Sequence, residues 1–145
     1  MKILLGIDHA DSAESTAQAV LDQFRAELSE VLVLHVLQPV ELAPAPEMAP
    51  RYAPELEDQQ APARALVEHI ANLLHSSGFK AETDVQIGDA TMNILDTAAG
   101  WHADLIVLGA QGKRDLQNIL IGSVAQSVAR QAKCSVEIVR TPPAY

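Results

Sequence analysis

The sequence predicts a doubly wound α/β fold of the Rossmann-like or flavodoxin-like kind. We expect a five-stranded parallel sheet of order 3-2-1-4-5 with helices on both faces. Short apolar runs alternate along the chain with segments of helical periodicity, which is typical of strands joined by crossover helices. The runs at 2–8 and 30–37 are apolar on both faces, as in strands covered from both sides. Aromatic residues make up 3% of a chain that is 48% hydrophobic, so an aliphatic core is expected.

The first part of the chain supplies two strands and one helix before a proline-rich segment. Residues 2–8 are expected to form the first strand, which ends at Asp8. Apolar side chains recur at helical spacing from Ala13 to Leu28 and predict one buried stripe. The second strand is expected at 30–37. Prolines then crowd the chain up to Pro62, so the segment 38–61 is predicted to be a loop.

The second part of the chain continues the alternation of helices and strands. Pro62 suits the first turn of a helix, and Gly78 suits its end. The strand at 80–87 alternates apolar with polar residues, which is expected at the edge of a sheet. Asp89 is expected to cap the following helix. The remaining elements are a strand at 104–109, a helix at 123–132 and a strand at 135–140.

The length and the composition predict one domain over residues 1–145 and limit the classes of function. A net charge of −9 counts against general binding to nucleic acid or to an anionic membrane, because both need clustered Lys and Arg. No apolar run approaches the roughly 20 residues of a membrane span, and the start lacks the form of a signal peptide. We therefore expect a cytoplasmic protein. Cys134 is the only cysteine, which excludes an intrachain disulfide and favours a packing thiol.

A glycine pattern follows the predicted fourth strand. The pattern consists of Gly109, two residues, Gly112, nine residues and Gly122-Ser123, and it leads into the last helix. The N–H groups and the dipole at such a strand-to-helix junction attract an anion. In a doubly wound sheet the first and fourth strands flank the point where the winding reverses, so Asp8 and Gly109 are predicted to face one crevice. These residues predict a site for the phosphates of a nucleotide.

These features together resemble the ATP-binding type of universal stress protein. The resemblance is carried by the glycine pattern, by the first strand ending in Asp8, by His35-Val36 at the end of the second strand and by the run 103–109. It covers nearly the whole chain. The resemblance implies an adenine nucleotide as ligand, ATP or else AMP or ADP, with any Mg²⁺ carried by the phosphates.

The resemblance also implies contacts for particular residues. Asp8 is expected to contact the adenosine part, and the main chain of Val36 is expected to bind adenine. The glycines and the Ser-Val that follows them are expected to hold the ribose and the phosphates. The charges of Lys113 and Arg114 fit a phosphate contact and a solvated loop equally well. The candidate binding residues are Gly6, Ile7, Asp8, Val36, Leu108, Gly109, Gly112, Lys113, Arg114, Gly122, Ser123 and Val124.

A homodimer through the strand at 135–140 is a further implication of the resemblance. The sequence departs from the family there, because Glu137 stands in a strand that is usually apolar. A charge on an edge strand discourages pairing between sheets. The resemblance still leads us to expect a dimer, although the charge of Glu137 counts against it.

Three functions remain open from the sequence. The first is a stress-response regulator, a switch or sensor in which nucleotide binding acts on the loop 113–121. The second is a slow ATPase or autophosphorylating enzyme, with Ser123 as a candidate acceptor. The third is a nucleotide-free interaction module, in which the glycines are only turn and cap residues. An electron-transfer-flavoprotein-like protein would share the topology, whereas no Ser-Gly-Gly-x-Asp-Ser follows the first strand as a PP-loop enzyme requires.

No catalytic or metal-binding residue is assigned from the sequence. It contains no P-loop, no Ser-His-Asp order and no positioned general base. His9 lies beside Asp8 and Asp11, but without a second histidine a turn is favoured over a metal site. His35 is expected to be a packed histidine of the core, because it lies within an apolar strand.

Overall fold

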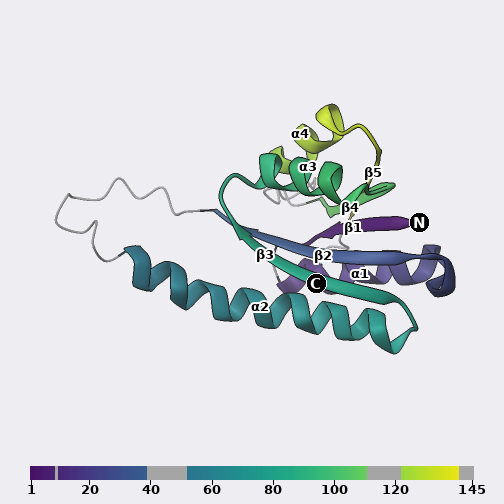
Figure 1. The fold of residues 1–145 in the computed structure, drawn as a ribbon, viewed down its shortest axis with the longest axis horizontal. Coiled ribbons are helices and arrows are strands. Elements are labelled where there is room, and N and C mark those ends of the chain that lie inside the picture. The colour runs from purple at the N-terminus through teal and green to yellow at the C-terminus, as the bar shows by residue number, and fades with distance from the viewer. Residues whose placement is uncertain (9, 39–51, 111–121, 141–145) are drawn as a thin grey trace, which may run out of the picture.

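The computed structural model describes residues 1–8, 10–38, 52–110 and 122–140. Figure 1 shows one sheet with α1 and α2 on one face and α3 and α4 on the other. All four strand pairs are parallel, and the order is β3-β2-β1-β4-β5. The predicted fold class and strand order are therefore confirmed.

The elements lie close to their predicted positions, with one exception in α2. They are β1 (Lys2–Gly6), α1 (Ala10–Gln23), the 3₁₀ turn η1 (Ala26–Leu28), β2 (Glu30–Leu37), α2 (Tyr52–Ser76), β3 (Lys80–Ile87), α3 (Ala90–Trp101), β4 (Leu105–Gly109), α4 (Ser123–Gln131) and β5 (Ser135–Val139). The parallel arrangement brings the carboxyl ends of all five strands to one edge of the sheet.

The two faces of the sheet form two aliphatic cores, because successive side chains of a strand point to opposite faces. On the face of α1 and α2, Ile3, Leu5 and Val33 are fully buried. On the face of α3 and α4, Leu4 and Ile106 are fully buried. The largest fully buried side chains of the described residues are all Ile, Leu or Val, which confirms the predicted aliphatic core.

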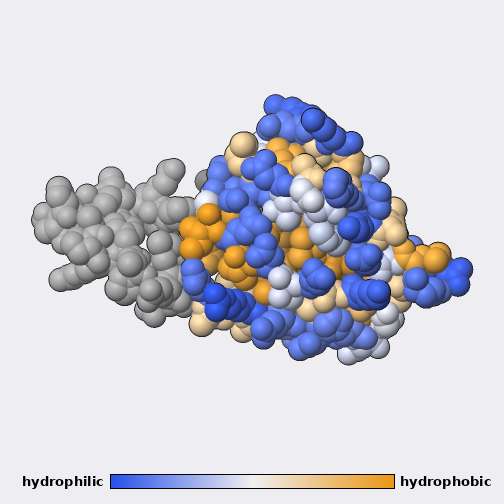
Figure 2. Space-filling view, viewed as in Figure 1, coloured by the Kyte–Doolittle hydropathy of each residue, from blue (hydrophilic) through white to orange (hydrophobic). Residues whose placement is uncertain are grey.

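The strands at the two edges are less buried than the central ones. Every residue of β4 is buried, whereas β3 and β5 contain no residue buried to that degree. Figure 2 shows hydrophilic residues spread over one face, with smaller hydrophobic areas between them. Ile87, at the carboxyl end of β3, is 43% exposed. The prediction that the third strand lies at an edge is confirmed.

The predicted loop at 38–61 is wrong in its second part. Helix α2 begins at Tyr52, so residues 52–61 are helical, and in Figure 1 the helix extends beyond the sheet. Pro54 lies in the first turn, where an N–H has no partner within the helix. Pro62 lies inside the helix and removes one backbone hydrogen bond. The buried stripe that follows it, including Val67, Ile70 and Leu74, anchors the helix on the sheet. Residues 39–51 of the predicted loop lie outside the described residues.

The start of α3 is fixed by the predicted cap. The Asp89 side chain accepts a hydrogen bond from Met92 N at 2.8 Å. The cap satisfies one of the N–H groups that the first turn leaves unpaired. It also fixes the position of Ala90, the first residue of the helix.

We expect Asp89→Ala to lower the free energy of unfolding by about 1 kcal/mol, because the N–H of Met92 loses its acceptor. Asp89→Asn keeps a side-chain oxygen at the cap and should cost much less. Urea unfolding of the two variants beside the wild type measures the difference. Equal destabilisation by both substitutions would contradict the capping role.

Candidate functional site

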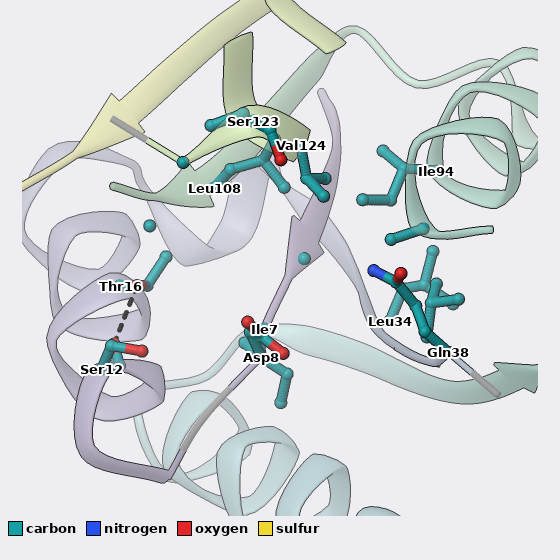
Figure 3. Close-up of a pocket in the computed structure, with 16 residues that line it drawn as sticks. Ile7, Asp8, Ser12, Thr16, Leu34, Gln38, Ile94, Leu108, Ser123 and Val124 are labelled. Carbon is teal, nitrogen blue, oxygen red and sulfur yellow. Dashed lines mark hydrogen bonds between the residues drawn. The ribbon is translucent and has the colours of Figure 1, made fainter. Parts of the chain in front are cut away.

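A pocket lies at the carboxyl ends of β1, β2 and β4 (Figure 3). Its volume is about 260 Å³, near the lower end of the roughly 300–1,000 Å³ typical of small-molecule sites. It is lined by Gly6, Ile7, Asp8, Ser12, Thr16, Leu34, Val36, Gln38, Ala90, Ile94, Leu108, Gly109, Gly122, Ser123, Val124 and Ala125.

The topology explains why the pocket is at this edge. The chain leaves β1 toward α1 on one face of the sheet, and it returns from β4 to α4 on the opposite face. The helices that follow these neighbouring strands therefore lie on opposite faces of the sheet, which is where a crevice forms in a doubly wound fold. Asp8, which follows β1, and Gly109, which ends β4, both line this crevice, as predicted.

The pocket brings together every candidate binding residue that the structure describes. These are Gly6, Ile7, Asp8, Val36, Leu108, Gly109, Gly122, Ser123 and Val124. The other three candidates, Gly112, Lys113 and Arg114, lie outside the described residues. The ligand contacts of all twelve remain predictions.

One wall of the pocket is apolar and continues the core of the α3/α4 face. Leu34, Ile94 and Leu108 line the pocket, and each is at most 5% exposed. In Figure 3, Ile94 and Leu34 lie on one side of the space, with Val124 above. This wall can take up a flat, weakly polar ring by burying its faces.

The opposite side of the pocket is polar. Asp8 is exposed and is the one charged side chain among the described lining residues. Ser12 and Thr16 of α1 are buried, and the Thr16 hydroxyl donates to the Ser12 carbonyl at 2.8 Å (Figure 3). A carboxylate accepts hydrogen bonds and repels anions, so this side suits hydroxyl groups better than phosphates.

The amino terminus of α4 forms a third part of the pocket. Gly122 is the N-cap residue of α4 and provides no side-chain cap. Gly122, Ser123, Val124 and Ala125 all line the pocket. The N–H groups of a first turn have no acceptor within the helix, and together with the positive end of the helix dipole they favour a negatively charged group.

Sequence reasoning missed seven lining residues. These are Ser12, Thr16, Leu34, Gln38, Ala90, Ile94 and Ala125. Five of them lie in the first two turns of helices that begin next to the crevice. A signal existed for Ser12 and Thr16, because they are four residues apart on the helix that follows Asp8 and so share one of its faces.

Other chemical groups lie away from this pocket. Among the residues that the structure describes, no three His, Cys, Asp or Glu side chains form a possible metal site. No helix in the same set is long and apolar enough to cross a membrane. Cys134 is half-buried, and burial raises the pKa of its thiol, which disfavours the reactive thiolate. His35 is buried in the core, as predicted.

The sequence and the fold are similar to those of known proteins. A family model described as the universal stress protein family matches residues 1–140. A universal stress protein of Synechocystis sp. is 31% identical over 149 residues, which cover 96% of this chain and 97% of that protein. The solved structure of the protein MJ0577 of Methanocaldococcus jannaschii is 27% identical with a TM-score of 0.81. That alignment covers 99% of this chain and 97% of the other.

Three further structures share the fold at lower identity. They are a universal stress protein in complex with cAMP, one from Archaeoglobus fulgidus in complex with dAMP, and one from Arabidopsis thaliana with AMP bound. Their identities are 22%, 20% and 19%, and their TM-scores are 0.72, 0.68 and 0.67. The alignments cover 98%, 96% and 98% of this chain and 98%, 97% and 92% of the other chains.

The lack of a side chain at Gly6 is a testable requirement of the pocket wall. A Cβ at Gly6 would lie 2.5 Å from Leu108 Cδ2, whereas one at Gly100 in α3 would meet nothing within 4 Å. We expect Gly6→Ala to destabilise the protein by about 1–3 kcal/mol, because the buried Leu108 must move. Gly100→Ala should stabilise it by up to about 1 kcal/mol through helix propensity.

Urea unfolding of both glycine variants measures these opposite shifts. The Gly100 variant controls for the general effect of adding a methyl group to the backbone. A Gly6→Ala protein as stable as the wild type would show that Leu108 yields freely and that the close approach of β1 and β4 is not needed.

Proposed function

Because the chain belongs to the universal stress protein family, we propose that the crevice at the carboxyl ends of β1 and β4 binds an adenine nucleotide. The observation that carries the proposal is the order of three different surfaces around one pocket. An apolar wall, a carboxylate and a helix amino terminus match a base, a sugar and a phosphate.

The fit can be followed group by group. Leu34, Ile94 and Leu108 offer apolar contacts to the faces of adenine. The carboxylate of Asp8 accepts hydrogen bonds from ribose hydroxyls. The N–H groups at the start of α4, at Ser123, are proposed to bind the phosphate. The solved relatives that contain cAMP, dAMP and AMP support an adenine nucleotide as the ligand class.

The finer parts of the proposal follow from family membership and from the sequence. ATP with Mg²⁺ carried by its phosphates is the proposed full ligand, and Gly112, Lys113 and Arg114 are proposed to supply further phosphate contacts. We assign the protein a cytoplasmic, regulatory role in stress, in which the bound nucleotide acts as a switch.

The proposed homodimer uses β5. This strand is at the edge of the sheet, and the outer N–H and C=O groups of an edge strand can pair with a second strand. The carboxylate of Glu137 accepts a hydrogen bond from Gln23 Nε2 of α1 at 2.8 Å. This bond draws the charge toward the α1 face, which lessens its effect on pairing at the edge.

The first experiment on this proposal identifies nucleotides released from the purified, denatured protein by chromatography and mass. Calorimetric titration of the ligand-free protein with AMP, ATP and GMP follows. Adenine nucleotide bound at one per chain, with GMP much weaker, is the expected result. Failure of both AMP and ATP to bind would overturn the proposed function.

We expect Asp8→Asn to weaken AMP binding by roughly 10- to 100-fold, because the ribose loses a charged acceptor. Asp96→Asn is the matched control, since Asp96 is an exposed carboxylate of α3 that does not line the pocket. Calorimetry on both variants checks the effect. An unchanged affinity in Asp8→Asn would remove Asp8 from the ligand contacts.

A further inference from the structure

The hydrogen-bond ladder between β1 and β2 ends next to the pocket with a bond from a side chain. The two strands pair in parallel register up to Gly6 and Leu34. One further backbone bond follows, from Ile7 N to Leu34 O at 2.9 Å. The Ile7 carbonyl is then bonded by a side chain, because His35 Nδ1 lies 2.8 Å from Ile7 O.

The geometry fixes the protonation of the ring nitrogen in this bond. A carbonyl oxygen only accepts, so Nδ1 of His35 carries a proton and donates it to Ile7 O. The residue His35 is 7% exposed and Ile7 is 6% exposed. Both backbone groups of Ile7 are thus held, the N–H by Leu34 and the carbonyl by His35.

Successive residues of a strand in a parallel sheet direct their backbone groups to opposite neighbouring strands. This alternation shows which backbone bond the bond from His35 replaces. Leu34 O faces β1, since it accepts from Ile7 N, while Leu37 O faces β3, since it accepts from Gly88 N at 2.9 Å. Val36 is two residues beyond Leu34, so its N–H is directed to the side of β1. In a continued parallel ladder Val36 N–H would donate to the Ile7 carbonyl, which in the described structure receives the imidazole instead.

We propose that His35 is a positioning residue of the pocket: its imidazole ends the β1–β2 ladder at Ile7, which fixes the backbone that carries Asp8 and keeps the N–H of Val36 for the ligand. Asp8 and Val36 both line the pocket. The inference rests on the proposed function, because it assigns His35 a role in binding the nucleotide without touching it.

The same geometry explains what losing the imidazole would do. With a side chain that cannot donate, the buried Ile7 carbonyl lacks its partner. The simplest repair is closure of the ladder by one bond, from Val36 N–H to Ile7 O. The chain would still fold, but it would withdraw one donor from the pocket and shift Asp8.

Two substitutions separate the hydrogen bond from the bulk of the ring. His35→Asn keeps an N–H donor close to the position of Nδ1, whereas His35→Leu keeps an apolar side chain of useful size without a donor. With AMP as the probe, His35→Leu is expected to bind at least about tenfold more weakly than the wild type, and His35→Asn within about threefold of it. His69→Leu, which changes an exposed histidine of α2, is the control and should bind normally.

A double-mutant cycle tests whether His35 acts through Asp8. Adding Asp8→Asn to His35→Leu should weaken AMP binding by clearly less than the product of the two single effects. Thermal unfolding without ligand shows whether each variant is folded before it is titrated. Wild-type affinity in His35→Leu or equal losses in both His35 variants would overturn the inference. Fully multiplicative effects would overturn the part of it that acts through Asp8.

A ligand-free readout distinguishes this inference from the proposed function. The ¹⁵N chemical shifts of the His35 ring should show a proton on Nδ1, with coupling across the bond to the Ile7 carbonyl. A neutral ring with its proton on Nε2 would overturn the hydrogen bond and the inference with it. If this bond is observed but the wild type binds no AMP, the proposed function and the role of His35 in binding are both wrong. The hydrogen bond from His35 to Ile7 at the end of the ladder would still be correct.

Discussion

The divergence of the chain after β1 and β4 is the constraint on which the rest of the site depends. Parallel strands place all carboxyl ends at one edge, and the helices α1 and α4, which follow the neighbouring strands β1 and β4, lie on opposite faces of the sheet. The crevice therefore needs no special residue to exist. What the sequence adds is the chemistry at its borders, with Asp8 after one strand and Gly109 at the end of the other.

The three parts of the pocket are kept apart by the layers of the fold. The apolar wall is an extension of the core under α3 and α4, and the hydroxyl side belongs to α1 on the other face. The carboxylate of Asp8 and the amino terminus of α4 have opposite electrostatic preferences, so a ligand with both hydroxyl groups and a phosphate has one favourable orientation. Because the chain has a net charge of −9, the binding of an anion depends on local features such as this dipole.

Much of this architecture was predictable because its signals are local. The strands at 30–37 and 80–87 were predicted with the bounds that the structure shows, since apolar runs and alternation depend only on neighbouring residues. The start of α2 could not be predicted in this way, because the prolines before residue 62 disfavour a regular helix. A proline in the first turn costs no hydrogen bond, and packing of the stripe beyond Pro62 on the sheet offsets the one that is lost.

The sequence by itself determined the fold class, the family and the residues that end the strands at the crevice, because all three follow from the order and spacing of residue types. Only the tertiary structure decided which helix residues complete the pocket. Ser12 and Ile94 come from helices on opposite faces of the sheet and meet only because the chain diverges between them. The bond from His35 to Ile7 joins residues 28 positions apart, and no local pattern of either strand marks it. Such contacts depend on strand register and side-chain direction, which pairing in three dimensions fixes.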